Sequence, residues 1–233
     1  MDVSSLVASP AIKILIPKGF DFIWHKIVGK KILICGLGRS GKTSFQKYLS
    51  RGILLKERDT EKTYEHEKIP DAKIVINSKS NFILRLTSSF DSPGQLGTIV
   101  QAASISDYRP DYLFIFLDCS RKQESLVWLA DFCENLDACF KKDPYLSKDL
   151  KNIYIVLNKY DKLKNKKKLS AVQQYKTFES KVKSILEINL KHSFYHSLMK
   201  IRIPQVFPSI CVKTKYGVGQ IDELINSFAS NSL

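Results

Sequence analysis

The stretch GLGRSGKT at residues 36–43 decides the fold class. It follows a short apolar run, KILIC at residues 31–35, and precedes a segment of helical character at residues 44–49. A G-x-x-x-x-G-K-T pattern between a strand and a helix is typical of a phosphate-binding loop, or P-loop. Its glycines let successive backbone N–H groups curl around phosphate oxygens, and the helix N-terminus adds the positive end of its dipole. The pattern therefore predicts a nucleotide site at the first strand.

Each residue type in this loop has an expected task. Lys42 is expected to reach the β and γ phosphates, and the Thr43 hydroxyl is expected to bind Mg²⁺. The nucleotide-binding residues predicted here are Gly36, Gly38, Arg39, Ser40, Gly41, Lys42, Thr43 and Ser44. The loop alone does not identify the nucleotide, because kinases, ATPases and GTPases all use it.

Five further apolar runs follow, at residues 73–76, 82–86, 112–117, 153–157 and 206–212. Helical patterns separate the later runs, most clearly at residues 123–140, 171–190 and 219–228. Strands that alternate with helices predict an α/β fold in which a mostly parallel sheet carries helices on both faces. Ligands of such sheets bind at the carboxyl ends of the strands, which is where the glycine-rich loop lies.

The chain has 233 residues and a formal net charge of +14. One α/β domain with a short appendage is expected at this length, because single cores grow to roughly 200 to 250 residues before they split. We place an N-terminal extension at residues 1–29 and the main domain at residues 30–233. Between Phe20 and Val28 the apolar residues recur at helical spacing and predict a short amphipathic helix. Its apolar face either packs on the domain or lies on a membrane.

The composition excludes several classes of protein. A 44% hydrophobic share and a 26% charged share match an ordinary globular protein and exclude wholesale disorder. No uncharged apolar run approaches the roughly 20 residues that cross a bilayer, so a cytoplasmic location is expected, with peripheral contact to a membrane as an alternative. The five cysteines lack C-x-x-C spacing and predict reduced, buried thiols.

A second motif follows the run at residues 153–157. Asn158, Lys159 and Asp161 form an N-K-x-D pattern at the expected carboxyl end of a strand. A carboxylate there can accept two hydrogen bonds from guanine, through its ring N–H and its exocyclic amine, while the lysine stem packs along the base. Adenine lacks that pair of donors and would leave the carboxylate unpaired. The motif therefore favours a guanine nucleotide.

A third motif, DSPGQ at residues 91–95, closes the expected third strand. Asp91 can hold a water of Mg²⁺, the Gly94 amide can contact the γ phosphate, and Gln95 can orient the attacking water. The same residues also suit a turn. A segment that serves both purposes is typical of a mobile switch loop, so Gln95 is the predicted catalytic residue.

Together these motifs resemble the Ras superfamily of small GTPases. GLGRSGKTSFQK, DSPGQ, NKYD and ICVKT stand in family order and cover the chain from Lys31 to about Phe228. The P-loop arginine, the SFQK after it and DSPGQ look most like the Rag/Gtr branch, with Arf-like proteins second. The resemblance implies a six-stranded sheet with five main helices and a GTP/GDP switch. The sequence ends after the last helix of such a domain, so the C-terminal dimerisation domain of Rag proteins is not expected.

Two parts of the family pattern are altered or ambiguous. Where the family has an S-A-K base loop, this sequence has Cys211, Val212 and Lys213. The Val212 amide could still face the guanine oxygen. For the switch I threonine that binds Mg²⁺, Thr60 lies at the expected spacing, 17 residues after Thr43, whereas Thr63 begins a more strand-like stretch. We favour Thr60, with Thr63 as second choice, beside Thr43 and a water-mediated Asp91.

The leading functional hypothesis is a molecular switch that binds GTP or GDP with Mg²⁺ and hydrolyses GTP slowly without an activating protein. One alternative is a nucleotide-bound scaffold with little hydrolysis, and another is a ribosome- or RNA-associated GTPase. The implied partners are effector, exchange and activating proteins, and a homo- or heterodimer with another small GTPase is left open. Residues 141–168 hold ten lysines and three aspartates, which predicts a basic face for an acidic partner or an anionic membrane rather than for nucleic acid.

Overall fold

A computed structural model of the chain describes residues 30–51, 67–69, 72–77, 82–91, 97–163, 170–190 and 201–202. Outside these residues lie the extension at 1–29, the predicted strand at 206–212, the predicted helix at 219–228 and seven predicted site residues, which are Thr60, Thr63, Gly94, Gln95, Cys211, Val212 and Lys213. What was inferred for them stays a prediction.

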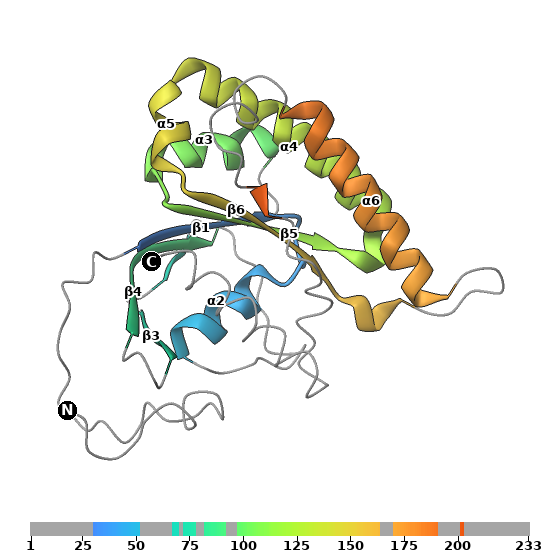
Figure 1. Ribbon diagram of the computed structural model, residues 1–233, viewed down its shortest axis with the longest axis horizontal. Coiled ribbons are helices and arrows are strands. Elements are labelled where there is room, and N and C mark those ends of the chain that lie inside the picture. The colour runs from blue at the N-terminus through green and yellow to red at the C-terminus, as the bar shows by residue number, and fades with distance from the viewer. Residues whose placement is uncertain are drawn as a thin grey trace, which may run out of the picture.

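One sheet organises the described residues (Figure 1). Its strands are β1 (Lys30–Gly36), β2 (Glu67–Ile69), β3 (Ala72–Asn77), β4 (Phe82–Asp91), β5 (Tyr112–Asp118), β6 (Asn152–Asn158) and β7 (Ile201–Arg202). The strand order is β2-β4-β1-β5-β6-β7, and β3 also pairs with β4. From β4 to β7 every pairing is parallel, whereas β2 and β3 run antiparallel to β4. The predicted mostly parallel sheet is confirmed.

The implied count of six strands is wrong, because the described sheet has seven. The strand β2 was missed because it spans three residues and begins with the charged pair Glu67 and Lys68, so it forms no apolar run. Pro70, which has no N–H to donate to a ladder, separates β2 from β3 in the sequence. The two segments accordingly pair with different parts of β4. The last described strand, β7, also precedes the run at 206–212 that was expected to close the sheet.

The central strands β5 and β6 are buried along their whole length. Their sequences, YLFIFLD and NIYIVLN, are nearly continuous apolar runs rather than alternating ones. A strand needs such a run when both faces of its sheet are covered. Each run ends on a polar residue, Asp118 or Asn158, and the parallel register places these two opposite each other. The core thus delivers two polar side chains to one point of the carboxyl edge.

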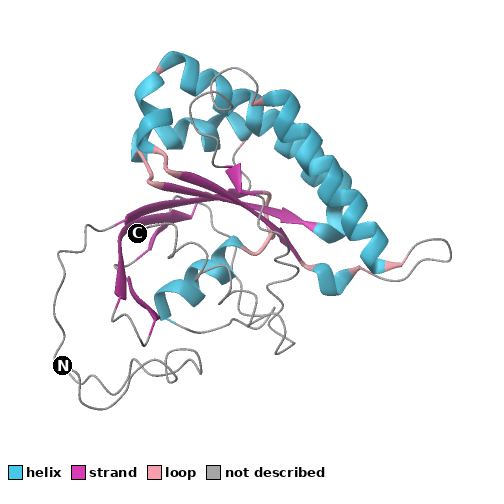
Figure 2. Cartoon of the chain, in the orientation of Figure 1, coloured by secondary structure: helices cyan, strands magenta, loops and turns pink. Residues whose placement is uncertain are grey.

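Helices cover both faces of the sheet, as the sequence predicts (Figures 1 and 2). They are α2 (Lys42–Arg51), α3 (Thr98–Tyr108), α4 (Lys122–Lys142), α5 (Pro144–Asp149) and α6 (Ala171–Asn189). Figure 1 shows α2 on one face and the other four on the opposite face. Among the described residues, no helix combines the length and apolar character that crossing a membrane requires.

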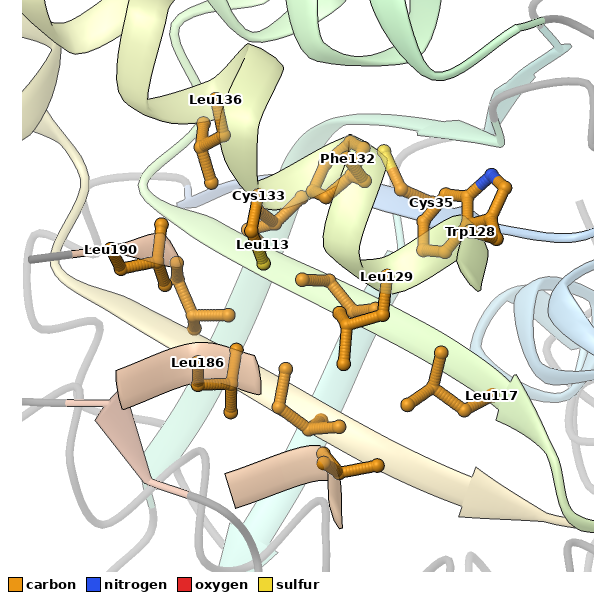
Figure 3. Close-up of a cluster of buried hydrophobic side chains, with 14 of the residues drawn as sticks. Cys35, Leu113, Leu117, Trp128, Leu129, Phe132, Cys133, Leu136, Leu186 and Leu190 are labelled. Atoms are coloured by element: carbon orange, nitrogen blue, oxygen red, sulfur yellow. The ribbon is translucent and has the colours of Figure 1, made fainter. Parts of the chain in front are cut away.

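The main core lies between the sheet and the helices α3, α4 and α6 (Figure 3). Leu129 and Phe132 of α4 and Leu113 of β5 are all fully buried there. On the opposite face, the ring of Phe45 in α2 packs 5.1 Å from that of Phe116 in β5, measured between centroids. Packing on both faces fixes the start of α2 against the end of β5, and these two points lie next to the predicted nucleotide site.

The described cysteines match the prediction of reduced thiols, and three of the four are buried as predicted. Cys35, Cys119 and Cys133 are buried thiols, whereas Cys139 is half-buried, and none of the four forms a disulfide among the described residues. Burial raises the pKa of Cys119 and of Cys133 to about 12, so neither thiol is a nucleophile near neutral pH. These cysteines act as small apolar core residues.

Candidate nucleotide-binding site

The P-loop joins β1 to α2 at the carboxyl edge of the sheet. The strand β1 ends at Gly36 and α2 begins at Lys42, as the strand–loop–helix pattern predicts. Gly36 and Gly41 adopt positive φ angles of 143° and 104°. A Cβ on Gly36 would lie 2.4 Å from the carbonyl oxygen of Phe116, and one on Gly41 would lie 2.1 Å from Nδ2 of Asn158. Both positions therefore require glycine, because a side chain would collide with the end of β5 or with Asn158.

The other predicted residues of the loop differ in exposure. Arg39 is exposed and adopts the left-handed conformation, with a φ of 63°. Ser40 is fully buried, and its N–H donates to the carbonyl of Leu37 at 3.3 Å. Gly38 and Ser44 are half-buried. The loop thus places a non-glycine residue in a conformation that usually favours glycine.

The side chain of Lys42 folds back into the loop and is 4% exposed. Its Nζ donates to the carbonyl oxygens of Gly36 at 3.0 Å and of Leu37 at 2.9 Å. A buried cation at the N-terminus of a helix produces a strongly positive local potential. This position therefore suits the negative charge of a phosphate group.

Two residues expected to hold Mg²⁺, Thr43 and Asp91, lie at the same carboxyl edge of the sheet. Thr43 is half-buried in the first turn of α2, and Asp91 ends β4, where its backbone pairs with Ile34 of β1. Hydroxyl and carboxylate oxygens are ligands that Mg²⁺ prefers, usually together with phosphates. The chemistry of these two donors, on elements that meet at one edge of the sheet, fits a phosphate-bound Mg²⁺. In the described part of the chain, no group of three or more His, Cys, Asp or Glu side chains could hold a metal ion alone.

The N-K-x-D motif lies directly against the P-loop. Asn158, at the end of β6, donates from Nδ2 to the carbonyl oxygen of Ser40 at 2.6 Å. Its Oδ1 accepts a hydrogen bond from the backbone N–H of Lys159 at 2.8 Å. One buried carboxamide therefore connects the two predicted motifs, which are 118 residues apart in the sequence.

A carboxylate that sequence analysis missed holds Lys159. Asp118 is fully buried at the end of β5, and its Oδ2 lies 2.8 Å from the Nζ of Lys159. Its Oδ1 accepts from the N–H of Ser120 at 2.8 Å and from its hydroxyl at 2.5 Å. Burial alone would raise the pKa of Asp118, but the hydrogen bonds from Lys159 and Ser120 outweigh it and lower the pKa below its ordinary value of 3.8. Asp118 therefore stays ionised and fixes the lysine.

The predicted base-binding residue Asp161 lies in a short 3₁₀ turn, η4 (Tyr160–Lys162), and its side chain is exposed. The turn follows Lys159, which has a left-handed φ of 62°. The ring of Tyr160 packs edge-on against Tyr175 of α6, with centroids 5.4 Å apart. This contact anchors the turn that carries Asp161, three residues after the Asn158 that bonds to the P-loop.

Two further contacts to the P-loop were also missed. Gln101 of α3 is fully buried and accepts a hydrogen bond from the N–H of Gly36 at 3.1 Å. Arg121 donates from Nη1 to the carbonyl of Gly38 at 3.0 Å. Neither side chain stands in a motif, and each reaches the loop from an element distant in sequence. The one available signal was the position of Asp118 and Arg121 next to the end of a predicted strand.

Comparison with solved structures places this arrangement among known folds. The chain is similar to a bacterial selenocysteine-specific elongation factor, EF-Sec, at 19% identity and a TM-score of 0.51, over 89% of this chain and 29% of that one. It is also similar to the mammalian SRP receptor, at 18% identity and a TM-score of 0.53, over 86% of this chain and 100% of that one. The fold is that of a P-loop GTPase G domain.

The likeness is one of fold. No model of a protein family matches the sequence, and a search of curated proteins finds no match. The chain spans only 29% of the length of EF-Sec, so the activity of that whole protein does not transfer. The assignment to the Rag/Gtr branch stays a prediction.

Three lysines in the described part of the region between residues 141 and 168 pair with carboxylates. Lys141 pairs with Asp137 at 2.7 Å and Lys151 with Asp111 at 2.9 Å. A third lysine of the region, Lys159, pairs with Asp118. All three carboxylates lie outside the counted region, whereas two of its own aspartates, Asp143 and Asp149, pair with Arg109 outside it. A count over consecutive residues therefore does not give the local charge.

Proposed function

We propose that the chain binds GTP and GDP together with Mg²⁺ and hydrolyses GTP slowly. The observation that carries this proposal is the 2.6 Å hydrogen bond from Asn158 to the Ser40 carbonyl, because it fixes the distance between the phosphate loop and the base loop. A ligand with a guanine base at one end and phosphates at the other spans both loops. The G-domain fold supports the same ligand class.

At the phosphate end, the backbone N–H groups of the P-loop and the start of α2 bind the oxygens. Lys42, now hydrogen-bonded to the Gly36 and Leu37 carbonyls, neutralises the β and γ phosphates. The Thr43 hydroxyl and Asp91, the latter through water, are the residues that would hold Mg²⁺. When bound, Mg²⁺ supplies positive charge next to the transferred phosphoryl group.

At the base end, Asp161 accepts the two hydrogen bonds that guanine offers. The stem of Lys159 packs along the base while Asp118 holds its ammonium. Because Asp118 accepts from both Lys159 and Ser120, the lysine keeps one orientation before the nucleotide arrives. Preorganisation of this kind lowers the entropic cost of binding.

For hydrolysis we propose that Gln95 orients the attacking water, with Gly94 and Thr60 contacting the γ phosphate or its metal. Intrinsic turnover is expected on the order of 10⁻³ per second or less until an activating protein contributes. Loss of the γ phosphate would then change the contacts of the switch segments, which is how such domains signal to effectors.

The test of nucleotide identity uses the purified 233-residue chain and fluorescent GDP, GTP and ATP. We expect tight binding of both guanine nucleotides and none of ATP. Asp161→Asn should weaken GDP binding by at least about 100-fold, because an amide in place of the carboxylate turns one acceptor towards guanine into a donor. The matched control is Asp149→Asn, an exposed carboxylate bound only to Arg109 among the contacts seen, which should leave GDP binding unchanged. Tight ATP binding without GTP binding would overturn the proposal.

The cellular role needs a separate experiment. We propose a signalling or trafficking switch, and a scaffold or a translation-associated GTPase would behave differently in the same assay. GDP-loaded and GTPγS-loaded protein should capture different partner proteins if the chain is a switch. Identical partners in both states support the scaffold, and salt-sensitive cosedimentation with ribosomes supports the translation role.

A further inference from the structure

Arg121 connects the end of β5 to the phosphate loop. It is the last residue of the short 3₁₀ turn η3 (Cys119–Arg121), whose start is fixed by the bond from the Ser120 N–H to Asp118. Its Nη1 donates to the carbonyl oxygen of Gly38 at 3.0 Å. Its Nε donates to Glu124 at 3.1 Å, and its Nη2 pairs with the same carboxylate. Glu124 therefore holds the guanidinium through Nε and Nη2, while Nη1 bonds to the P-loop.

The contact controls the direction of one peptide group. Gly38 and Arg39 share a planar, trans peptide unit, in which the C=O and the N–H point in opposite directions. Because the Gly38 carbonyl points at Arg121, the N–H of Arg39 points away from η3. In loops of this type, backbone N–H groups form the cradle for phosphate oxygens.

This peptide needs support more than others in the loop. Arg39 has a φ of 63°, a conformation that costs free energy for a residue with a side chain. Rotating the peptide would relieve that cost and would turn the N–H out of the cradle. A hydrogen bond from a charged donor to the carbonyl opposes the rotation and is stronger than one from a neutral donor.

We propose that Arg121 is a positioning residue for the phosphate loop. It holds the Gly38 carbonyl so that the Arg39 N–H faces the nucleotide phosphates, and its positive charge polarises that peptide. The proposal rests on the proposed function, since it concerns the same nucleotide site. Arg121 would promote hydrolysis through the peptide group between Gly38 and Arg39, without itself touching a phosphate.

Polarisation matters most when negative charge develops on the leaving phosphate oxygens. A donor aimed at developing charge contributes more in the transition state than in the ground state. The loss of Arg121 should therefore lower hydrolysis more than it lowers GDP affinity. A residue that merely stabilised the fold would lower the thermal midpoint and both functions together.

The test compares Arg121→Ala, Arg121→Lys and the matched control Arg109→Ala, which removes another half-exposed arginine with carboxylate partners. Three measurements are made on each: the GDP dissociation rate, single-turnover GTP hydrolysis and the thermal midpoint without nucleotide. Arg121→Ala should slow hydrolysis by about tenfold, less than the 10²- to 10³-fold loss on removing an oxyanion donor, because the N–H remains but is misaligned. The GDP dissociation rate should rise by about threefold, with the midpoint unchanged.

Arg121→Lys keeps the charge and should retain most of the hydrolysis rate, and added guanidinium ion should partly restore Arg121→Ala. Equal behaviour of Arg121→Ala and Arg109→Ala in all three measurements overturns the positioning role while leaving the proposed function intact. So does a loss in hydrolysis no larger than the loss in GDP affinity. A wild-type chain that binds no guanine nucleotide refutes the proposed function, and the positioning role fails with it.

Discussion

Two ionic clusters of this molecule use similar chemistry in opposite environments. At the carboxyl edge of the sheet, Lys159 pairs with Asp118, and the two side chains are 20% and 0% exposed. At the far end of α3, Arg109 pairs with Asp143 at 2.7 Å and with Asp149 at 3.0 Å, and its side chain is 48% exposed. The distances between the paired atoms are similar in the two clusters, whereas the exposure of the side chains differs.

The two clusters differ in how much folding free energy is lost when one partner is removed. Water can solvate Arg109 and its partners if one of them is removed, so little is lost. Asp118 has no such substitute, since its side chain is fully buried and its two oxygens are occupied by Lys159 and Ser120. We infer that this buried ion pair orients Lys159, a lysine of the predicted base-binding motif. The four predictions below test this contrast, beginning with the largest effect.

Removing the buried carboxylate should have the largest effect. In Asp118→Ala the ammonium of Lys159 loses its partner, and Ser120 loses the acceptor that fixes the start of η3. Breaking a buried pair costs 3–5 kcal/mol, and because Lys159 is partly exposed we expect about 3 kcal/mol of unfolding free energy. Urea denaturation measures this loss, and GDP titration should show weaker binding. Asp118→Asn, which keeps an acceptor, should lose less; an Asp118→Ala loss below that of Arg109→Ala would contradict the contrast.

A neutral contact at the same edge should rank second. Asn158→Ala removes the hydrogen-bond partner of the Ser40 carbonyl and of the Lys159 N–H. We expect the free energy of unfolding to fall by about 2 kcal/mol, because buried polar groups lose their partners. The base loop would also separate from the P-loop, so GTP affinity should fall together with stability. Asn135→Ala is the matched control, since its carboxamide bonds to Asp131 and Thr98 away from the site. If both variants bind GTP equally well, the tie between the two loops has no role in binding.

The carboxyl edge also shows how far sequence reasoning extends. The P-loop and the N-K-x-D motif were predictable because each is a run of consecutive residues whose chemistry needs that spacing. Asp118 was not, because its partnership with Lys159 arises from the parallel register that sets Asp118 opposite Asn158. Arg121 and Gln101 reach the P-loop across even longer separations in the chain. The short helix α5 and the strand β2 were missed because six and three residues are too few to establish a periodic pattern.

Acid should act on the buried cluster in a defined direction. The pKa of Asp118 lies below its ordinary value of 3.8 in the folded chain, so the folded state favours the ionised form. Its contribution to stability is therefore complete above about pH 5 and decreases as the pH falls through the ordinary value towards the lowered one. The difference in unfolding free energy between wild type and Asp118→Asn should follow this course in denaturation series between pH 7 and pH 3. A difference that grows towards low pH would show that the carboxylate is not stabilised by its partners.

The exposed cluster should give the smallest and most salt-dependent effect. Arg109→Ala removes both exposed ion pairs, and since surface pairs contribute 0–1 kcal/mol, the loss should not exceed about 1 kcal/mol. Arg109 has a left-handed φ of 43°. Because arginine and alanine both carry a Cβ, the conformational cost of this backbone is the same in wild type and variant. The screening length falls from about 10 Å at 0.1 M salt to about 3 Å at 1 M, so the loss should nearly vanish in urea denaturation at about 1 M NaCl. Under the same conditions Asp118→Ala should keep most of its loss, because ions do not enter the buried position. Equal salt dependence of Arg109→Ala and Asp118→Ala would show that burial does not protect the Asp118 cluster from screening, and it would contradict the contrast.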